Sequence, residues 1–258
     1  IERSAWDGAW YRRAWFDDGS PLGTSANVEC RIDSIAQSWS VLSGGADATR
    51  KRQAMESVDV HLVHRDSAIV QLLDPPFNHS APNPGYIQGY LPGVRENGGQ
   101  YTHAAVWAAM AFAELGDAQR AWELFTLLDP IRHADCAQAV ALYKVEPYVL
   151  ASDVYAMPPH TGRGGWTWYT GSAGWMLRFM LESVLGLNVQ GNQLRIAPCY
   201  PQHWQTFTLN YRYRETLYRI EVCSSAGRVD GSGWSLDGTG CPAPFVTLVD
   251  DRRDHSVV

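Results

Sequence analysis

Helix gives way to strand within the segment GSAGWMLRFMLESVLGLNVQGNQLRIAP (171–198). Helical periodicity runs over 171–185, and Gly186 then ends the helix. Beyond Gly186 the segments are short, rich in β-forming residues and separated by turn residues, as in NQLRIAPCY, FTLNYRYR and LYRIEVC. The sequence therefore predicts an α+β protein, with helices in a first domain over 1–186 and a small antiparallel β-sandwich over 187–258.

Paired helices alternate with long loops in the 1–186 part. Helical spacing of apolar residues covers 29–44, and a second helix is expected after Asp47, which can serve as its N-cap. Further helices are expected over 100–115, 117–128 and 134–143. Two long segments between the helices, 71–93 and 144–170, are rich in Pro, Gly or aromatic residues and predict loops. Loops of this length usually carry a function.

Composition narrows the function classes. The net charge of −6 leaves no basic stripe, which argues against nucleic acid as a partner. Eleven Trp and twelve Tyr suit stacking on sugar faces, although core packing is the commoner use of such rings. Five cysteines without a CxxC pair indicate reduced thiols in a cytosolic setting and no zinc site. No apolar run is long enough to span a membrane.

Four blocks of the sequence resemble successive blocks of one enzyme family. They are AWDGAWYRRAWFDDGSPLG (5–23), RENGGQYTHAA (95–105), KVEPYVLASDVY (144–155) and GRGGWTWYTGSAGWM (162–176). In this order they resemble the inverting glycoside phosphorylases that include cellobiose and chitobiose phosphorylases, in particular the carboxyl-terminal phosphorylase-like domain of cyclic β-1,2-glucan synthases. The resemblance implies the C-terminal part of an (α/α)6 barrel followed by a jelly-roll-like β-sandwich tail.

The same resemblance implies a reaction. In this family a carboxylic acid protonates the leaving oxygen while inorganic phosphate attacks the anomeric carbon with inversion, so phosphate is a co-substrate and no cofactor or metal is expected. The substrate implied is a β-glucan, β-1,2-linked, cleaved to a sugar 1-phosphate or made in reverse. The family acid is an Asp in a DWND-like stretch, which this sequence lacks. We therefore assign no catalytic residue, expect the acid upstream of Ile1, and predict that this chain alone is inactive.

The resemblance assigns phosphate binding to three residues. His103 matches the family histidine that contacts phosphate, and Thr170 with the backbone amide of Gly171 matches the other contact. A hydroxyl followed by free amides at a helix start suits an anion. The alternative interpretation is that Thr170 is only an N-cap and His103 an ordinary helix residue.

Sugar contacts are predicted in three places. Tyr90, Arg95 and Glu96 match positions that contact the acceptor-side sugar, although the family commonly has Lys where Arg95 stands. The alternatives are a packed loop Tyr and a solvated Glu–Arg pair. Further glycan contacts are predicted at Glu146 and Arg163, which are charged residues inside aromatic loops. Trp166 and Trp168 are predicted to form a platform on which a sugar stacks, and the alternative for these two rings is core packing.

The expected partners are a β-glucan oligosaccharide, phosphate and the remainder of a longer parent chain, because the sequence opens without an initiator Met. A homodimer is left open. The expected location is the cytoplasmic side, as part of an inner-membrane protein. The alternative function, kept beside the glycosyltransferase and phosphorylase one, is a non-catalytic glycan-binding or structural module.

Overall fold

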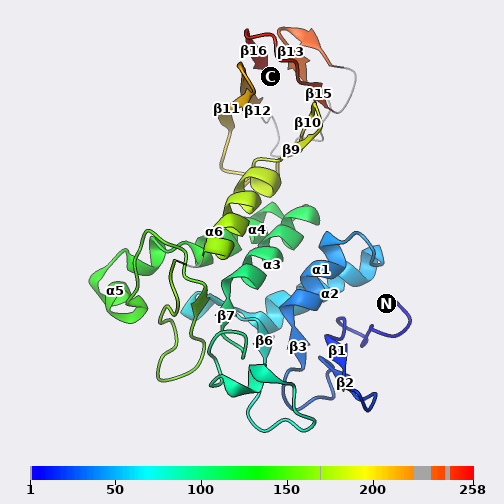
Figure 1. Ribbon diagram of the computed structural model, residues 1–258, viewed down its shortest axis with the longest axis vertical. Coiled ribbons are helices and arrows are strands. Elements are labelled where there is room, and N and C mark those ends of the chain that lie inside the picture. The colour runs from blue at the N-terminus through cyan, green and yellow to red at the C-terminus, as the bar shows by residue number, and fades with distance from the viewer. Residues whose placement is uncertain (1, 169, 224–233, 242–244) are drawn as a thin grey trace.

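The structure is a computed structural model that describes residues 2–168, 170–223, 234–241 and 245–258. A helical part with long loops carries a β-sheet tail at one end (Figure 1). The helices are α1 (Ser34–Leu42), α2 (Ala48–Leu62), α3 (Thr102–Glu114), α4 (Ala118–Leu128), α5 (Ala137–Tyr143) and α6 (Thr170–Arg178). A π-helical segment, Phe179–Val184, extends α6 toward the tail. None of the helices described is long and apolar enough to cross a membrane.

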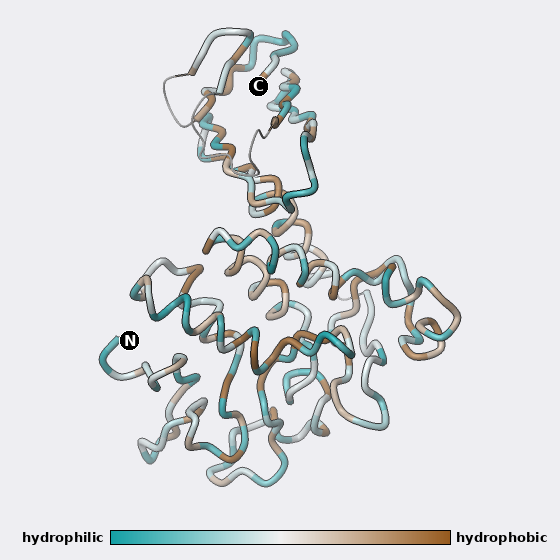
Figure 2. Tube along the Cα trace, turned by 180° about the vertical axis from the view of Figure 1, so that it is seen from behind, coloured by the Kyte–Doolittle hydropathy of each residue, from teal (hydrophilic) through white to brown (hydrophobic). Residues whose placement is uncertain are grey.

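Helix α3 is the centre of the helical part. It packs against α1, α2, α4 and α6, and it is buried on nearly every side. Its sequence THAAVWAAMAFAE explains this, because alanine side chains let neighbouring helices approach closely while the helix stays apolar all round. Figure 2 shows hydrophobic residues along these central helices and along the strands of the tail. The central position of α3 fixes its first turn, which carries His103.

Helix starts show one correct and one wrong prediction. Asp47 caps α2, as predicted, by accepting hydrogen bonds from the amides of Thr49 and Arg50. The helix predicted to start at residue 29 begins only after Asp33, whose carboxylate accepts from the amides of Ile35 and Ala36. The residues just before the cap are extended instead, because β3 (Ile32–Asp33) pairs with β6 (Leu73–Asp74).

Short strand pairs tie the long loops to the helices. The pair that matters for the site joins β7 (Gln100–Tyr101), directly before α3, to β8 (Asp153–Val154). The 71–93 segment, predicted to be irregular, contains β6 and one 3-10 turn (Tyr86–Gly89). Two further pairs are β1 (Ala14–Trp15) with β2 (Pro21–Leu22), and β4 (Val63–His64) with β5 (Ile69–Val70).

Two sheets form the tail. The first has the order β15 (Val246–Thr247), β10 (Gln193–Ile196), β9 (Leu187–Gln190). The second has the order β11 (Thr206–Tyr213), β12 (Thr216–Cys223), β16 (Asp254–Val257), β13 (Ser235–Leu236), β14 (Thr239–Gly240). Buried side chains from both sheets, Ile196 and Ile220 among them, belong to one hydrophobic cluster, which also includes residues of the helices.

The tail is not wholly antiparallel, and in this respect the prediction is wrong. Strands β12 and β16 are parallel, with Leu217 opposite Asp254. The reason is the path of the chain between them. Asp250, shortly before β16, accepts hydrogen bonds from the amide of Glu215 and the hydroxyl of Thr216, so β16 starts beside the start of β12 and runs the same way. The α+β class itself holds.

Candidate functional site

His103 and Gly171 are in direct contact. His103 lies in the first turn of α3 and Gly171 in the first turn of α6. A Cβ atom at position 171 would lie 2.5 Å from Nε2 of His103, so only glycine leaves room for the imidazole there. Thr170 is exposed and is the first residue of α6. The three residues predicted to bind phosphate are therefore neighbours, and the N-cap position falls on residue 169, outside the described residues.

The His103 ring is held by aromatic neighbours. It stacks on Tyr101 with the ring centroids 5.2 Å apart and meets Trp107 edge-on at 6.5 Å. Burial lowers the pKa of His103, which favours a neutral imidazole at pH 7. Its Nδ1 is buried without a hydrogen-bond partner among the described residues. A neutral ring beside the free amides of a helix start is a donor set suited to an anion.

The guanidinium of Arg95 contacts two aromatic rings on the loop side of the site. Cζ of Arg95 is 4.8 Å from the ring centroid of Trp166 and 5.3 Å from that of Tyr90. We call these three residues the Arg95 stack. Glu96 follows in sequence, with its Oε2 4.0 Å from Nε of Arg95. The structure thus brings together four of the predicted sugar contacts, and the buried Oε2 of Glu96 speaks against a fully solvated ion pair.

Asp153 was missed by the sequence reasoning. Its side chain is 1% exposed, and its Oδ1 accepts a hydrogen bond from the amide of Trp166 at 3.0 Å. Burial raises the pKa of Asp153, with a smaller contribution from the charge of Glu96, while the amides of Trp166 and Arg95 act in the opposite direction. The available signal was a lone acid in the otherwise uncharged run YVLASDVYAM.

Trp168 and Glu146 form a second contact among the predicted residues. The Trp168 indole Nε1 donates to Oε1 of Glu146 at 3.2 Å. The pKa of Glu146 is lowered by its own amide and then by hydrogen bonds from Trp168 and Thr167. Trp168 is 64% exposed and Trp166 51% exposed, so core packing, the alternative interpretation for these two rings, is wrong.

Arg163 is not brought into this cluster. Its side chain is exposed, its amide donates to the carbonyl of His160, and its carbonyl accepts from the amide of Tyr155. Within the described ranges, its guanidinium makes no hydrogen bond or ion pair with the other predicted site residues.

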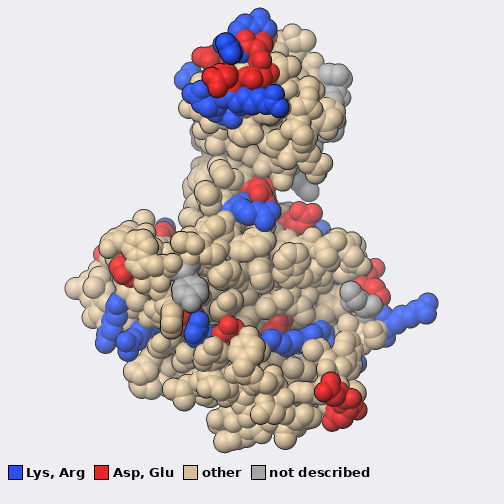
Figure 3. Space-filling model, in the orientation of Figure 1, with Lys and Arg blue, Asp and Glu red and all other residues tan. Residues whose placement is uncertain are grey.

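Several buried polar atoms at this site lack a hydrogen-bond partner. Among the described residues, those near the start of α3 and the adjoining loops are Glu96 Oε2, Thr102 Oγ1, His103 Nδ1, Trp107 Nε1 and Asp153 Oδ2. Buried polar atoms are normally paired, so such a concentration is typical of a ligand site. On the face seen in Figure 3, acidic and basic side chains lie close together across the helical part, with no continuous basic surface. His103 and the Gly171 amide lie on the α6 side of the site, and Glu96 and the Arg95 stack lie on the loop side.

Two family models and several known proteins match this chain. The model "Glycosyl hydrolase 94 superfamily, catalytic domain" matches residues 1–186, and "Glycosyl hydrolase family 65, C-terminal domain" matches 187–231. Cyclic beta-(1,2)-glucan synthase NdvB of Rhizobium meliloti is 49% identical over 222 residues, which cover 86% of this chain and 8% of that protein.

Two phosphorylases are also similar to this chain. 3-O-beta-D-glucopyranosyl-beta-D-glucuronide phosphorylase of Paenibacillus borealis is 32% identical over 246 residues, covering 91% of this chain and 31% of that protein. N,N'-diacetylchitobiose phosphorylase of Vibrio proteolyticus is 30% identical over 224 residues, covering 86% and 27%. The chain thus spans less than a third of each of these relatives. Because the first family model covers most of the sequence, the chain belongs to the glycosyl hydrolase 94 superfamily, as its four sequence blocks predict.

Proposed function

We propose that this chain forms the phosphate- and sugar-binding part of an inverting glycoside phosphorylase-type domain that acts on β-1,2-glucan. The observation that carries the proposal is the contact between His103 and Gly171 at the start of α6. Family membership supports the reaction class, and the 49% identity to a protein named a cyclic beta-(1,2)-glucan synthase supports the linkage. In this proposal α1 to α6 are the C-terminal part of an (α/α)6 barrel.

The two sides of the site suit two different ligands. Phosphate is an anion and is attracted by the amide of Gly171, the hydroxyl of Thr170 and the N–H of His103. The carboxylate of Glu96 repels an anion, yet it accepts hydrogen bonds from sugar hydroxyls. The exposed rings of Trp166 and Trp168 and the partly exposed ring of Tyr90 offer apolar faces to a sugar. Glu146 and Arg163 belong to the proposal as outer glycan contacts.

The proposed reaction is the one that the resemblance to the inverting phosphorylases implies. A phosphate oxygen forms a bond to the anomeric carbon from one face, and the bond from that carbon to the leaving oxygen breaks on the other face. The electron pair stays on the leaving oxygen, which takes a proton from a general acid. The sequence contains no DWND-like stretch, so the proposal assigns this acid to a residue upstream of the 258 residues. The reverse direction transfers a hexosyl group from sugar 1-phosphate to the glucan.

The proposal has two further parts. They are the remainder of a longer parent chain as a partner and a cytoplasmic location as part of an inner-membrane protein, while a homodimer is left open. A glycan-binding module without phosphate is the less favoured function, because such a module does not need the donor set at His103, Thr170 and Gly171.

Selective loss of one ligand tests the proposal. We expect His103→Ala to weaken binding of inorganic phosphate by about tenfold, the loss of one charge-assisted hydrogen bond, and to leave binding of a linear β-1,2-glucotetraose unchanged. Glu96→Ala should do the reverse. Titration calorimetry measures both ligands, and His79→Ala in an exposed loop is the control. If each variant weakens both ligands equally, the proposed division is wrong.

A further inference from the structure

We infer that Asp153 is a positioning residue that holds the Arg95 stack in place and thereby supports sugar binding without supporting phosphate binding. The inference rests on the proposed function for its ligands and on the contacts of Asp153 for its geometry. Neither the sequence blocks nor the family comparison assigns this residue a role.

Asp153 holds the segment that supplies the Trp166 ring. Its Oδ1 accepts a hydrogen bond from the amide of Trp166 at 3.0 Å, and the Trp166 ring in turn contacts the guanidinium of Arg95. Trp166 and Arg95 are the two members of the stack in closest contact, at 4.8 Å. One buried carboxylate therefore holds the backbone of the residue whose ring lies against the Arg95 guanidinium.

The residues next to Asp153 and Trp166 add further hydrogen bonds between the two segments. The amide of Ser152 donates to the carbonyl of Trp166 at 2.7 Å, and the Ser152 hydroxyl donates to the same carbonyl at 3.0 Å. The amide of Gly165 donates to the carbonyl of Asp153 at 2.8 Å. A Cβ atom at position 165 would collide with the Asp153 carboxylate, so glycine is what allows the loop to lie directly on it.

The held conformation is not a relaxed one. Arg95 has a φ of +50°, in the left-handed region that a non-glycine residue rarely adopts. Such a backbone persists when the surrounding structure fixes it, and it occurs often at ligand sites. Asp153 holds the Trp166 backbone, and the Trp166 ring contacts the side chain of Arg95. The Arg95 side chain is attached to this strained backbone. A shift of the backbone therefore also moves the guanidinium relative to the rings of Tyr90 and Trp166.

A purely stabilising role does not explain a carboxylate at this position. Burying a charge is costly unless the charge is well paired, and Oδ2 of Asp153 has no hydrogen-bond partner among the described residues. An ionised acceptor, however, makes a stronger hydrogen bond to an amide than a neutral acceptor does. The buried carboxylate therefore lowers the stability of the fold but holds the Trp166 backbone, and with it the Arg95 stack, more firmly.

The phosphate side does not depend on the Asp153 side chain. His103 is positioned by α3, by stacking on Tyr101 and by its contact with Gly171. Tyr101 pairs with Asp153 only through the backbone of β7 and β8, which a side-chain substitution leaves intact. Sugar and phosphate binding should therefore respond differently to changes at position 153.

A double-mutant cycle tests the inference on the 258-residue chain. We expect Asp153→Ala to weaken binding of β-1,2-glucotetraose by about tenfold and to change phosphate binding by less than about twofold, since only the stack is released. Against a Trp166→Ala background, the same substitution should add less than about twofold, because the two residues act as one unit. Full additivity, or equal losses for both ligands, would overturn the inference.

Three further variants sharpen the result. Asp153→Asn keeps an oxygen for the Trp166 amide and should restore sugar binding to within about threefold of the original chain. Gly165→Ala should reproduce Asp153→Ala by pushing the loop off the carboxylate, which keeps the test open if Asp153→Ala fails to fold. Asp129→Ala is the matched control, because Asp129 accepts the amide of Ile131 at 3.0 Å in a loop without site residues.

A measurement without ligand separates this inference from the proposed function. In ¹⁵N-labelled chain, the Trp166 indole N–H signal, assigned with Trp166→Phe, should shift or broaden in Asp153→Ala and stay in place in Asp129→Ala. An unchanged signal in Asp153→Ala would overturn the positioning role. A changed signal in a chain that binds no sugar would support the positioning role and contradict only the proposed function.

Discussion

At position 171 a single missing methyl group makes room for the His103 ring. Gly171→Ala should push the imidazole away and weaken phosphate binding by about tenfold, while the helix itself gains about 0.5–1 kcal/mol from the better helix former. Gly174→Ala on the same helix is the matched control, because nothing lies within 4 Å of its added Cβ atom. Phosphate titration and urea unfolding measure both variants. Equal phosphate affinity in the two variants would show that the contact with His103 has no part in binding.

Burial and anion binding act on the ionisation of His103 in opposite directions. Its pKa lies below the ordinary 6.5 because of burial, so the unfolded chain takes up a proton first as the pH falls. The free energy of unfolding should therefore decrease as the pH is lowered from 6.5 to the folded pKa, and this decrease should be absent in His103→Gln. Bound phosphate should raise the pKa, because an anion favours the imidazolium. NMR titration of the ring proton with and without phosphate measures the shift, and a pKa indifferent to phosphate contradicts the proposed contact.

At the scale of single elements, helix α2 could be predicted and the start of α1 could not. Asp47 precedes α2 in a segment with no other role, so the cap is readable from the sequence. Ile32 fits the helical stripe of α1 equally well, but it lies in β3 and pairs with Asp74, which is more than forty residues away. Asp33 forms an ion pair with Arg13 in addition to capping α1. Contacts between distant segments thus decided a boundary that local periodicity left ambiguous.

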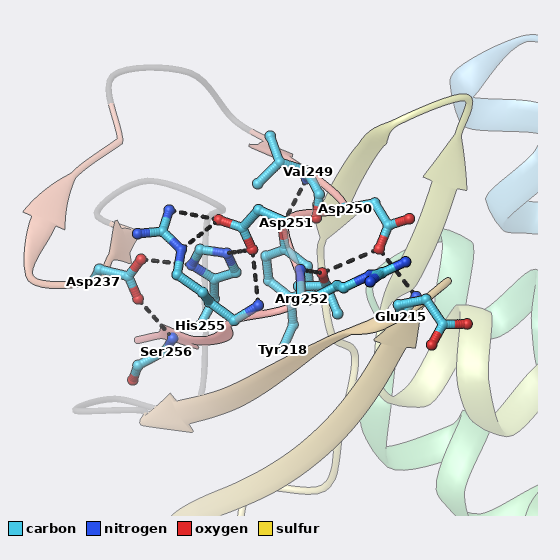
Figure 4. Close-up of polar contacts among 11 residues, drawn as sticks. Glu215, Tyr218, Asp237, Val249, Asp250, Asp251, Arg252, His255 and Ser256 are labelled. Carbon is cyan, nitrogen blue, oxygen red and sulfur yellow. Dashed lines mark hydrogen bonds and ion pairs between the residues drawn. The ribbon is translucent and has the colours of Figure 1, made fainter.

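In strand β16 of the tail, the histidine His255 lies between two carboxylates (Figure 4). Nδ1 of His255 faces Oδ2 of Asp237 at 2.7 Å, and Nε2 faces Oδ1 of Asp251 at 3.1 Å. The ring also stacks on Tyr218 of β12 at 4.9 Å. A protonated imidazole donates through both nitrogens to these two acceptors, so the arrangement favours the charged ring.

The stability of the tail should therefore fall as the pH rises. The hydrogen bond to Asp237, and then that to Asp251, raise the pKa of His255 above 6.5. The resulting stabilisation is fully present below 6.5 and is lost as the pH rises through the folded pKa, the reverse of the dependence at His103. Urea unfolding followed across this window should show the decrease, and His255→Gln should remove it. A stability of the His255 chain that is flat with pH would contradict the assignment.

At the scale of the whole molecule, the α+β organisation was predictable because helical and extended periodicities differ along the chain. Strand direction was not, since β16 reaches its place beside β12 only after the chain has passed through the other sheet. The candidate site was partly predictable in the same sense. His103, Gly171 and Arg95 stand in recognisable blocks, whereas the burial of Asp153 arises only when the 164–168 loop folds over it.

The last prediction concerns the chain as a catalyst. A positioned general acid typically contributes about 10² to 10⁴ in rate, and the proposed function places that acid outside the 258 residues. Purified chain incubated with β-1,2-glucan and phosphate should therefore bind both ligands and release no glucose 1-phosphate. A longer chain that also contains the DWND-like stretch should release it, and substituting Asn for the acid in that stretch should abolish the release. His103→Ala in the longer chain should raise KM for phosphate far more than KM for glucan, because His103 contacts only phosphate. Release of glucose 1-phosphate by the 258-residue chain would mean that it already carries an acid. The partly buried Glu96, whose Oε2 has no hydrogen-bond partner among the described residues, would then be the first carboxylate to substitute.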